Sequence, residues 1–389
     1  IEREISSSLL SLSGQYPVVT ITGPRQSGKT TLVKQVFPDK PYFNLEHPEN
    51  REFARIDARG FLNRMPEGGI IDEVQHVPEL LSYIQVLADE SDAPGRFILT
   101  GSSQFKLMEA VTQSLAGRSA LLRLLPFSLQ EMRRGSWELE VDGLIHSGFY
   151  PRIHDRGLEP NQALGDYCET DGERDIRQIA QIRNLSLFQR FIRLCAGRCG
   201  QLLNLSSLAD DTGISHTTAR EWISLLETSY LVFLLQPFHA NIKKRLVKSP
   251  KLYFYDVGLA AYLLGIEEAN QVATHPLRGS LFENMIVAEV LKYRFNMGKR
   301  SNLWFYRDAK GLEVDLILTK AEKWLSVEIK SGMTLNRDYF RALNRVERAL
   351  GPAPLGRLLI YAGERVEQRE GVRVCGVFSL PEALRELGI

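Results

Sequence analysis

The sequence predicts an α/β fold in three parts: a parallel-sheet P-loop domain, a winged helix-turn-helix domain, and a C-terminal α/β domain. Three observations predict these parts. An apolar, β-branched run at 18–22 leads into the octapeptide GPRQSGKT, which a helix-forming segment follows. A helix, a glycine-containing turn and a second helix follow one another between 205 and 229. From about 275 onwards, the hydrophobic pattern indicates a helix, three strands, a second helix and a fourth strand.

Length and composition limit the classes of protein to consider. The 389 residues suffice for two or three domains, and 44% hydrophobic with 24% charged residues is typical of a globular protein. A formal net charge of +1 gives no overall attraction to nucleic acid or membrane, so such a contact needs a local patch. No apolar run approaches the roughly 18 residues of a membrane span, and the N-terminus does not resemble a signal peptide. We therefore expect a cytoplasmic protein without membrane contact, whose four cysteines are reduced.

The octapeptide fits the phosphate-binding pattern G-x-x-x-x-G-K-[ST]. Glycines let backbone N–H groups close around a phosphate, and the helix N-terminus adds partial positive charge. Lys29 is expected to reach the β- and γ-phosphates and so to take part in catalysis, while the Thr30 hydroxyl binds Mg²⁺. The predicted cofactors are therefore ATP and Mg, and the predicted contacts are Gly23, Pro24, Arg25, Gln26, Ser27, Gly28, Lys29, Thr30 and Thr31.

Two acidic residues at the end of a short strand are predicted to complete this site. Asp72 and Glu73 follow Ile70 and Ile71 about forty residues after the P-loop. Asp72 is expected to hold the Mg²⁺ shell through water, and Glu73 to orient and deprotonate the attacking water. The alternative is a solvated acidic pair at a strand end.

A third strand, predicted at 96–100, ends in a serine-rich turn. Because parallel α/β sheets bind ligands at the carboxyl ends of their strands, a hydroxyl there can sense the γ-phosphate. Ser102 is the candidate, with Thr100 and Ser103 as its neighbours. It serves equally well as the N-cap of a helix at 104–110.

Arg118 precedes a strand-like run at 120–125. It is a candidate arginine finger that stabilises charge on the transferred phosphoryl group. Acting in trans it requires at least a homodimer, whereas acting in cis it does not, and the sequence leaves both open. The alternative is a structural ion pair.

The chain resembles the predicted AAA-superfamily ATPases of bacteria and archaea, whose C-terminal half is a domain of unknown function. The first third matches in GPRQSGKTTL, YFNLEHPENREFA, GGIIDEVQHVPEL, ILTGSSQF and SLAGRSALLRLLPFSLQEM. Later matches are GFYPRI, ERDIRQI, SPKLYFYDVGLAAYL, GSLFENMIVAEVL, GLEVDLIL and VEIKSG. The resemblance covers nearly the whole chain, and it implies an AAA-type first domain that binds and hydrolyses ATP.

The middle of the chain predicts a winged helix. Helices at 205–211 and 215–229 flank a Gly213 turn, and a basic hairpin at 242–251 follows between two strands. In DNA-binding winged helices the last of these helices enters the major groove, and basic wing residues contact phosphates. The predicted partner is nucleic acid, in the first place DNA, and a protein-interaction module is the alternative. The predicted contacts are Thr217 and Arg220, with His216 and Thr218, on the helix, and Lys243, Lys244, Arg245, Lys248 and Lys251 in the wing.

Charged residues recur inside the apolar strands of the last part. The predicted elements are helices at 280–293 and 338–350 and strands at 303–307, 313–318, 325–330 and 358–361. Asp315 interrupts one strand, and on the next strand Glu328 and Lys330 point to the face opposite Val327. Two carboxylates and an ammonium group are therefore expected to converge, with Glu283 on the preceding helix as a third carboxylate. Buried charges of this kind are costly unless they pair or bind metal.

This arrangement resembles the PD-(D/E)xK, or restriction-endonuclease-like, superfamily, although Val314 replaces the usual proline before Asp315. The resemblance implies that Asp315 and Glu328 bind Mg²⁺ with support from Glu283, and that Lys330 positions or activates water. The alternative is a buried ion-pair network in a nuclease fold without activity.

We predict four segments: an ATPase domain at 1–135, a helical connector at 136–183, a winged helix at 184–265 and a nuclease-like domain at 266–389. The predicted function is an AAA-type ATPase acting on nucleic acid, with a Mg-dependent nuclease-like domain gated by nucleotide. The alternative is an ATP-dependent regulatory switch or scaffold that binds a protein partner, with the nuclease-like domain inactive.

Overall fold

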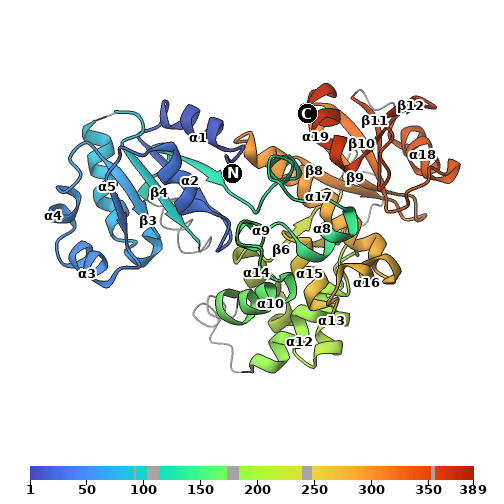
Figure 1. Cartoon of the computed structure of the whole chain (residues 1–389), viewed down its shortest axis with the longest axis horizontal. Helices are drawn as coiled ribbons and strands as arrows, with labels where there is room; N and C mark the ends of the chain where they lie inside the picture. The colour runs from blue at the N-terminus through green and yellow to red at the C-terminus, as the bar shows by residue number, and fades with distance from the viewer. Residues whose placement is uncertain (92, 103–113, 173–183, 239–247, 352–354) are drawn as a thin grey trace.

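The computed structural model describes residues 1–389 except 92, 103–113, 173–183, 239–247 and 352–354. Three lobes follow one another along the chain (Figure 1). The first lobe holds the P-loop, the middle lobe is largely helical, and the third lobe holds the C-terminal sheet. Among the described residues, no helix combines the length and the apolar character needed to cross a bilayer.

A five-stranded parallel sheet forms the first lobe. Its order is β2-β3-β4-β1-β5, so the strand that leads into the P-loop lies at the inside of the sheet. The strands are β1 (Val18–Thr22), β2 (Tyr42–Asn44), β3 (Gly69–Asp72), β4 (Phe97–Gly101) and β5 (Ser119–Arg123). Strands β1, β3 and β4 are buried along their whole length, as expected for a parallel sheet covered on both faces. The predicted parallel-sheet domain is therefore confirmed.

Helices cover both faces of this sheet. On one face α1 (Ser6–Ser13) and α2 (Lys29–Val36) bury Leu9 and Leu32 against Val19 and Ile21 of β1. The other face is covered by α3 (Pro48–Ile56), α4 (Ala58–Leu62), the short η1 (Val74–His76) and α5 (Leu80–Glu90).

The middle lobe begins with short helices and continues with a helix-turn-helix. The helices are α7 (Leu129–Arg133), α8 (Val141–Ser147), α9 (Pro151–Arg156), α10 (Pro160–Asp166), η2 (Tyr167–Gly172), α12 (Leu185–Ala196), α13 (Leu205–Thr212), α14 (His216–Thr228), α15 (Val257–Leu263) and α16 (Ala269–Thr274). Gly213 ends α13 with a φ of 84°, and the Ser215 hydroxyl caps α14 by accepting from the Thr218 N–H. An antiparallel pair, β6 (Val232–Leu235) and β7 (Lys251–Phe254), follows.

The third lobe is a six-stranded mixed sheet of order β12-β13-β11-β10-β9-β8. Its strands are β8 (Leu303–Arg307), β9 (Glu313–Lys320), β10 (Lys323–Lys330), β11 (Gly356–Tyr361), β12 (Glu367–Arg369) and β13 (Val372–Gly376). The first three form an antiparallel meander, and β11 lies parallel to β10 after a crossover. The helical elements are α17 (Arg278–Asn296), η3 (Arg337–Phe340), α18 (Arg341–Leu350), η4 (Val377–Ser379) and α19 (Leu380–Glu386).

Helices α17 and α18 cover opposite faces of this sheet. Buried residues of α17 pack with Val327 of β10, whereas Leu343 of α18 packs with Leu359 of β11. The α17 core continues without a break into the middle lobe, where it includes Leu144 and Leu259. The predicted boundary at 265/266 therefore divides secondary-structure units that share one hydrophobic core.

Candidate functional site

The P-loop leaves β1 in a conformation that only glycine fits at its first position. Gly23 has a φ of 154°, and a Cβ there would lie 2.0 Å from the carbonyl oxygen of Leu124, the residue that directly follows β5. Gly28, at a φ of 90°, forms the N-cap of α2. The loop therefore closes against β5 and presents the N-terminus of α2 at the carboxyl end of the sheet.

Lys29 begins α2 and folds its side chain back over the loop. Its ammonium group donates to the carbonyl oxygens of Gly23 at 3.0 Å and of Pro24 at 2.7 Å. The side chain is buried. The loop carbonyl groups therefore hold the Lys29 ammonium group in place before a phosphate binds.

Asp72 is the central acceptor of the site. Its Oδ2 accepts from the Thr30 hydroxyl at 2.7 Å and from the Tyr42 hydroxyl at 2.6 Å, and its Oδ1 accepts from Thr100. Burial and then the Asp72 carboxylate raise the pKa of Tyr42 well above its usual range. The structure thus brings Thr30 and Asp72 together, and it adds Tyr42, which sequence reasoning missed.

Glu73 has a left-handed backbone with a φ of 56°, a conformation that is uncommon for a residue with a side chain. Its carboxylate accepts from the Ser102 hydroxyl at 3.1 Å and from the Gln75 amide. Its N–H donates to the Thr100 hydroxyl at 3.3 Å. Ser102 therefore contacts the predicted base directly, whereas Ser103 and the helix predicted at 104–110 lie outside the described residues.

Arg118 lies at the opposite edge of the sheet from the P-loop of its own chain. Ser119 pairs with Val18 at the start of β1, whereas the P-loop follows Thr22 at its end. At about 3.3 Å per residue, the length of the strand separates Arg118 from the loop by roughly 16 Å. Its guanidinium group pairs with Asp89 of α5, with 3.0 Å between Nη2 and Oδ2. Arg118 therefore forms a structural ion pair within its own chain. The strand register contradicts the prediction that Arg118 acts on the P-loop of its own chain.

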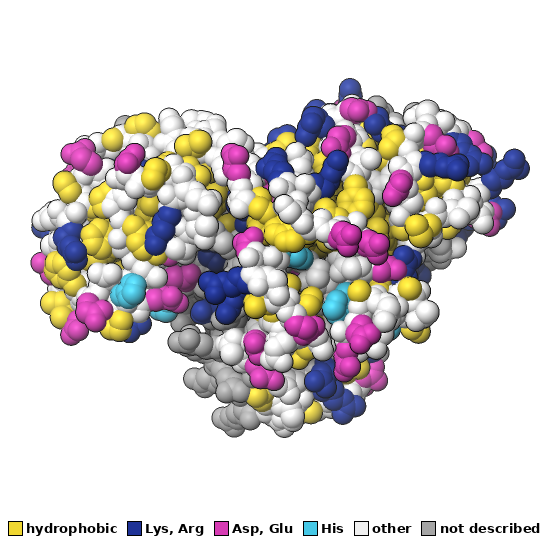
Figure 2. Space-filling view, viewed as in Figure 1, with side chains coloured by type: hydrophobic (Ala, Val, Ile, Leu, Met, Phe, Trp, Pro, Cys, Tyr) yellow, Lys and Arg dark blue, Asp and Glu magenta, His cyan; other side chains and the backbone are white. Residues whose placement is uncertain are grey.

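Helix α9 of the middle lobe faces the P-loop. A cavity of about 460 Å³ is bounded on one side by the loop, α2 and Glu73, and on the other by Pro151, Arg152, Asp155 and Arg156. Figure 2 shows Lys and Arg side chains gathered where the first and middle lobes meet. Sequence reasoning missed Arg152 and Arg156. The signal that could have indicated them is the matched stretch GFYPRI, because its proline begins α9, the helix that carries both arginines.

Asp315, Glu328 and Lys330 converge where the β9–β10 ladder ends. The last ladder pair joins Leu316 to Val327, and beyond it the Asp315 carboxylate accepts from the Ile329 N–H at 2.8 Å. The Lys330 ammonium lies 2.5 Å from Glu328 Oε1 and 3.5 Å from Asp315 Oδ2. The predicted convergence of these three groups is therefore present.

One oxygen of Glu328 is buried and has no hydrogen-bond partner among the described residues. Burial, followed by repulsion from Asp315, raises the pKa of Glu328 to about 8, although Lys330 opposes the shift. The carboxyl group is therefore poised to hold a proton or a cation near neutral pH.

Glu283 of α17 is engaged elsewhere. It accepts from the Lys251 ammonium at 3.0 Å and from the Tyr253 hydroxyl, and Lys251 also lies 2.6 Å from Glu313. Burial and then Asp315 raise the pKa of Glu283 to about 7. Across the described part of the chain no three His, Cys, Asp or Glu side chains form a group suited to a metal ion, and Glu283 is hydrogen-bonded to Lys251 and Tyr253.

The expectation that Lys251 contacts phosphate from the wing is wrong. Its side chain is 3% exposed, because β7 is buried along its length and turns Lys251 toward the two glutamates. By contrast, His216, Thr217 and Arg220 on α14 are exposed, as is Lys248. The remaining predicted wing contacts, Lys243, Lys244 and Arg245, lie outside the described residues.

Comparisons with known proteins match three stretches of the chain. Residues 15–133 match the family described as an AAA domain, and residues 139–270 and 278–380 match two domains of unknown function, DUF8612 and DUF4143. Together with the P-loop geometry, the AAA match makes the protein an ATP-binding P-loop ATPase of the AAA type.

The relatives span nearly the whole chain. The uncharacterized proteins Rv2008c of Mycobacterium tuberculosis and Mb2031c of Mycobacterium bovis are 30% identical to this chain over 367 residues, which is 93% of this chain and 80% of each relative. The chain belongs to the family of these two proteins. MJ1544 of Methanocaldococcus jannaschii is 22% identical over 361 residues, covering 84% of this chain and 76% of that protein.

Among solved structures, the Walker-type ATPase PABY2304 of Pyrococcus abyssi aligns with a TM-score of 0.45 at 15% identity, over 68% of this chain and 95% of that one. AMPPCP-bound DnaA of Aquifex aeolicus aligns with a TM-score of 0.29 at 15% identity, over 57% and 85% of the two chains.

Proposed function

We propose that ATP turnover in the first lobe controls cleavage of nucleic-acid phosphodiesters by the third lobe, a PD-(D/E)xK-like nuclease domain. The observation that carries the proposal is the convergence of Asp315, Glu328 and Lys330 at the end of the β9–β10 ladder. The order of elements supports it, because a helix, an antiparallel meander, a crossover helix and a parallel strand surround the three groups.

The donor set at this site fits Mg²⁺ through two residues. A buried carboxylate oxygen without a partner is costly, and the free oxygen of Glu328 beside Asp315 is such an atom. Asp315 and Glu328 would hold the ion through oxygen ligands, which Mg²⁺ prefers. When bound, the ion would supply charge against the phosphate and lower the pKa of a water ligand. Lys330, already between the two carboxylates, would orient that water.

At the ATP site, Thr30 and Asp72 would hold Mg²⁺, since their oxygens lie 2.7 Å apart beside the loop. Glu73 would take the proton of the attacking water, and Ser102, hydrogen-bonded to Glu73, would report on the γ-phosphate. Arg152 and Arg156 face the same cavity from α9, and their positive charge would favour the phosphates.

The middle lobe would bind nucleic acid as a winged helix. Thr217 and Arg220 are exposed near the start of α14, the position from which such helices reach base edges. Lys248 is exposed in the proposed basic wing, which Lys243, Lys244 and Arg245 would complete.

Helix α17 supports the gating part of the proposal. Its Glu289 accepts from the Leu129 N–H next to the ATPase lobe at 2.9 Å, and its Glu283 lies two turns away beside the nuclease-like site. A nucleotide-dependent shift at Leu129 would therefore reach Glu283 through one rigid element.

The test is cleavage of labelled single- and double-stranded DNA and RNA with Mg²⁺ or Mn²⁺, with and without ATP. Glu328→Gln removes the unpartnered carboxylate, and Glu322→Gln, exposed on the turn before β10, is the matched control. We expect Glu328→Gln to abolish cleavage and Glu73→Gln to abolish only its dependence on ATP. Cleavage that survives Glu328→Gln would contradict the proposal.

A second function, an ATP-dependent switch that binds a protein partner, is favoured by the ion pairs of the same cluster. Lys330 already forms ion pairs with Asp315 and Glu328, and Lys251 forms one with Glu283. ATP hydrolysis without cleavage under every condition above would select this function.

A homo-oligomer with Arg118 as a finger in trans is also proposed, because Arg118 lies on the outer edge of the first lobe. Mixing Arg118→Ala, which retains its own P-loop, with Lys29→Ala, which retains the finger, would restore ATP hydrolysis. No restoration in the mixture would contradict it.

A further inference from the structure

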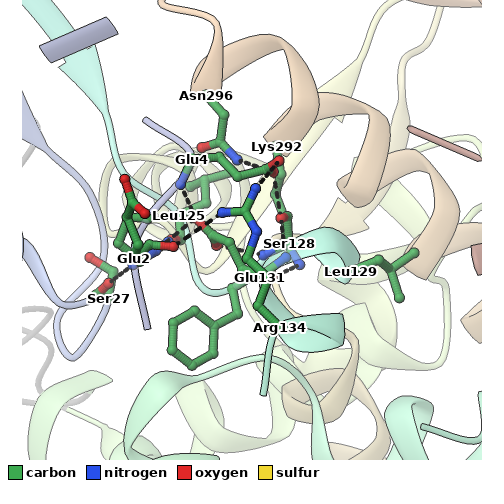
Figure 3. A network of polar contacts seen from close by, with 12 residues as sticks. Glu2, Glu4, Ser27, Leu125, Ser128, Leu129, Glu131, Arg134, Lys292 and Asn296 are labelled. Atoms are coloured by element: carbon green, nitrogen blue, oxygen red, sulfur yellow. Dashed lines mark hydrogen bonds and ion pairs between the residues drawn. The ribbon is translucent and has the colours of Figure 1, made fainter. Parts of the chain in front are cut away.

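Arg3 is buried behind the P-loop and contacts three acceptors from separate parts of the chain. Its Nη1 donates to the Ser27 carbonyl oxygen at 2.6 Å, its Nη2 to the Leu125 carbonyl oxygen at 2.7 Å, and its Nε to Glu131 Oε1 at 2.9 Å. Figure 3 labels Ser27, Leu125 and Glu131 within one network of polar contacts. Only 5% of Arg3 is exposed, so all three bonds are made away from bulk water.

The bond to Ser27 fixes the direction of one peptide of the P-loop. In a trans peptide the C=O and the following N–H point in opposite directions. The Ser27 carbonyl points to Arg3, so the Gly28 N–H of the same peptide points away from Arg3. Gly28 lines the nucleotide cavity, whereas Arg3 does not.

Gly28, on the C-terminal side of this peptide, has a left-handed φ of 90°, and Gln26, one residue before Ser27, has a φ of 58°. This peptide turns over by a large rotation of ψ at Ser27 and of φ at Gly28, which glycine permits, and the phosphate-binding pattern depends on its orientation. A buried Ser27 carbonyl that lost Arg3 would be left without this charged donor, which is costly.

The guanidinium is itself held rigidly. Glu131 closes a capping box with Ser128 at the start of α7, and its Oε1 also accepts from the Glu4 N–H at 2.7 Å. Three acceptors around a planar fork suit arginine, and the single ammonium group of lysine does not reproduce that geometry.

We propose that Arg3 is a positioning residue for ATP binding and hydrolysis. Its guanidinium holds the Ser27–Gly28 peptide so that the Gly28 N–H faces the β-phosphate. The residue acts through the loop and makes no contact with the nucleotide. The proposal rests on the ATPase site alone and is independent of the nuclease-like domain.

The test measures the affinities for ADP and AMP, kcat and KM for ATP, and the melting temperature in the full chain. The variants are Arg3→Ala and Arg3→Lys. Arg134→Ala is the matched control, because Arg134 is 43% exposed, pairs with Glu4 at 3.7 Å and belongs to the same network without contact to the P-loop.

Loss of a buried charge-assisted hydrogen bond predicts that Arg3→Ala weakens ADP binding about 10- to 100-fold. AMP, which lacks the β-phosphate, is expected to bind within about twofold of wild type. The ADP affinity of Arg3→Lys is expected to lie between those of Arg3→Ala and wild type, and the ADP affinity of Arg134→Ala is expected to equal that of wild type. Wild-type ADP affinity in a folded Arg3→Ala, or equal losses for ADP and AMP, would overturn the proposal. If Arg3→Ala does not fold, Arg3→Lys decides by the same ratio of ADP to AMP affinity.

Discussion

Replacing Lys251 with methionine tests whether this lysine is a structural ion-pair partner or a surface residue of the wing. Its ammonium group lies 3.0 Å from Glu283 and 2.6 Å from Glu313, and the side chain is almost completely buried. The substitution keeps the length of the apolar stem, removes the cation that pairs with Glu283, and leaves Glu313 with Arg307 as its partner. We therefore expect a large loss of stability in the C-terminal lobe.

The structure sets the size of the loss. Removing one partner of a buried ion pair costs about 3–5 kcal/mol, and the partial exposure of Glu283 and Glu313 places the estimate near the lower end. The matched control is Lys248→Met, because Lys248 is exposed and lies three residues earlier. A surface change of that kind is expected to stay within about 0.5 kcal/mol of wild type.

The loss of stability in Lys251→Met also depends on pH, and the ionisation of Glu283 decides whether the loss grows or shrinks as pH rises. Burial and Asp315 raise the pKa of Glu283 to about 7, so folding favours its protonated form. Stability linked to this group is complete below its usual pKa near 4.5 and declines as pH rises through 7. Lys251 opposes that decline, so the gap between Lys251→Met and wild type should widen from pH 5.5 to pH 8.5.

The assay is urea unfolding followed by tryptophan fluorescence, since Trp304 and Trp324 lie on β8 and β10 of the same lobe. The free energies of unfolding of wild type, Lys251→Met and Lys248→Met are compared at both pH values. A Lys251→Met variant as stable as Lys248→Met, or a gap that narrows at pH 8.5, would refute the reasoning.

Three further predictions concern the ATP site. Lys29→Ala removes the ammonium group held by the loop and should weaken ATP binding by about 100-fold, measured by titration calorimetry. Glu73→Gln should lower the rate of ATP hydrolysis about 10²- to 10⁴-fold while ATP affinity is retained, and equal losses of both would contradict its role as the base. Gly23→Ala places a Cβ 2.0 Å from the Leu124 carbonyl oxygen and should impair ATP binding, whereas Gly14→Ala, with its nearest contact at 3.5 Å, should not.

The P-loop and its acidic partners were predictable because each belongs to a local strand-to-turn pattern. The spacing from Lys29 to Asp72 and Glu73 places them at the same edge of a parallel sheet. Tyr42 and Gln75, which hydrogen-bond to these two acids, carry no such local signal. Tyr42 reaches Asp72 only because β2 pairs with β3. That pairing joins segments far apart in the sequence, so no local pattern predicts it.

Lys251 shows how a correct local pattern leads to a wrong site. It ends a run of basic residues, which is typical of a phosphate-binding wing, and the same run predicted a strand immediately after it. The residue belongs to that strand, β7, whose side chains are buried. The acids that neutralise it lie on α17 and β9, so nothing within the basic run distinguishes Lys251 from the exposed Lys248.

The place of Arg118 was decided by the order of strands rather than by its neighbours in sequence. A residue just before a strand lies at the amino edge of a parallel sheet, and nucleotides bind at the carboxyl edge. Because β5 is parallel to β1 and pairs in register with it, Arg118 and the P-loop lie at opposite edges of one sheet. Had β5 been antiparallel, the same residue would lie beside Gly23. The parallel pairing therefore excludes Arg118 as an arginine finger for the ATP site of its own chain. An ATP site that Arg118 completes would have to belong to a second copy of the protein.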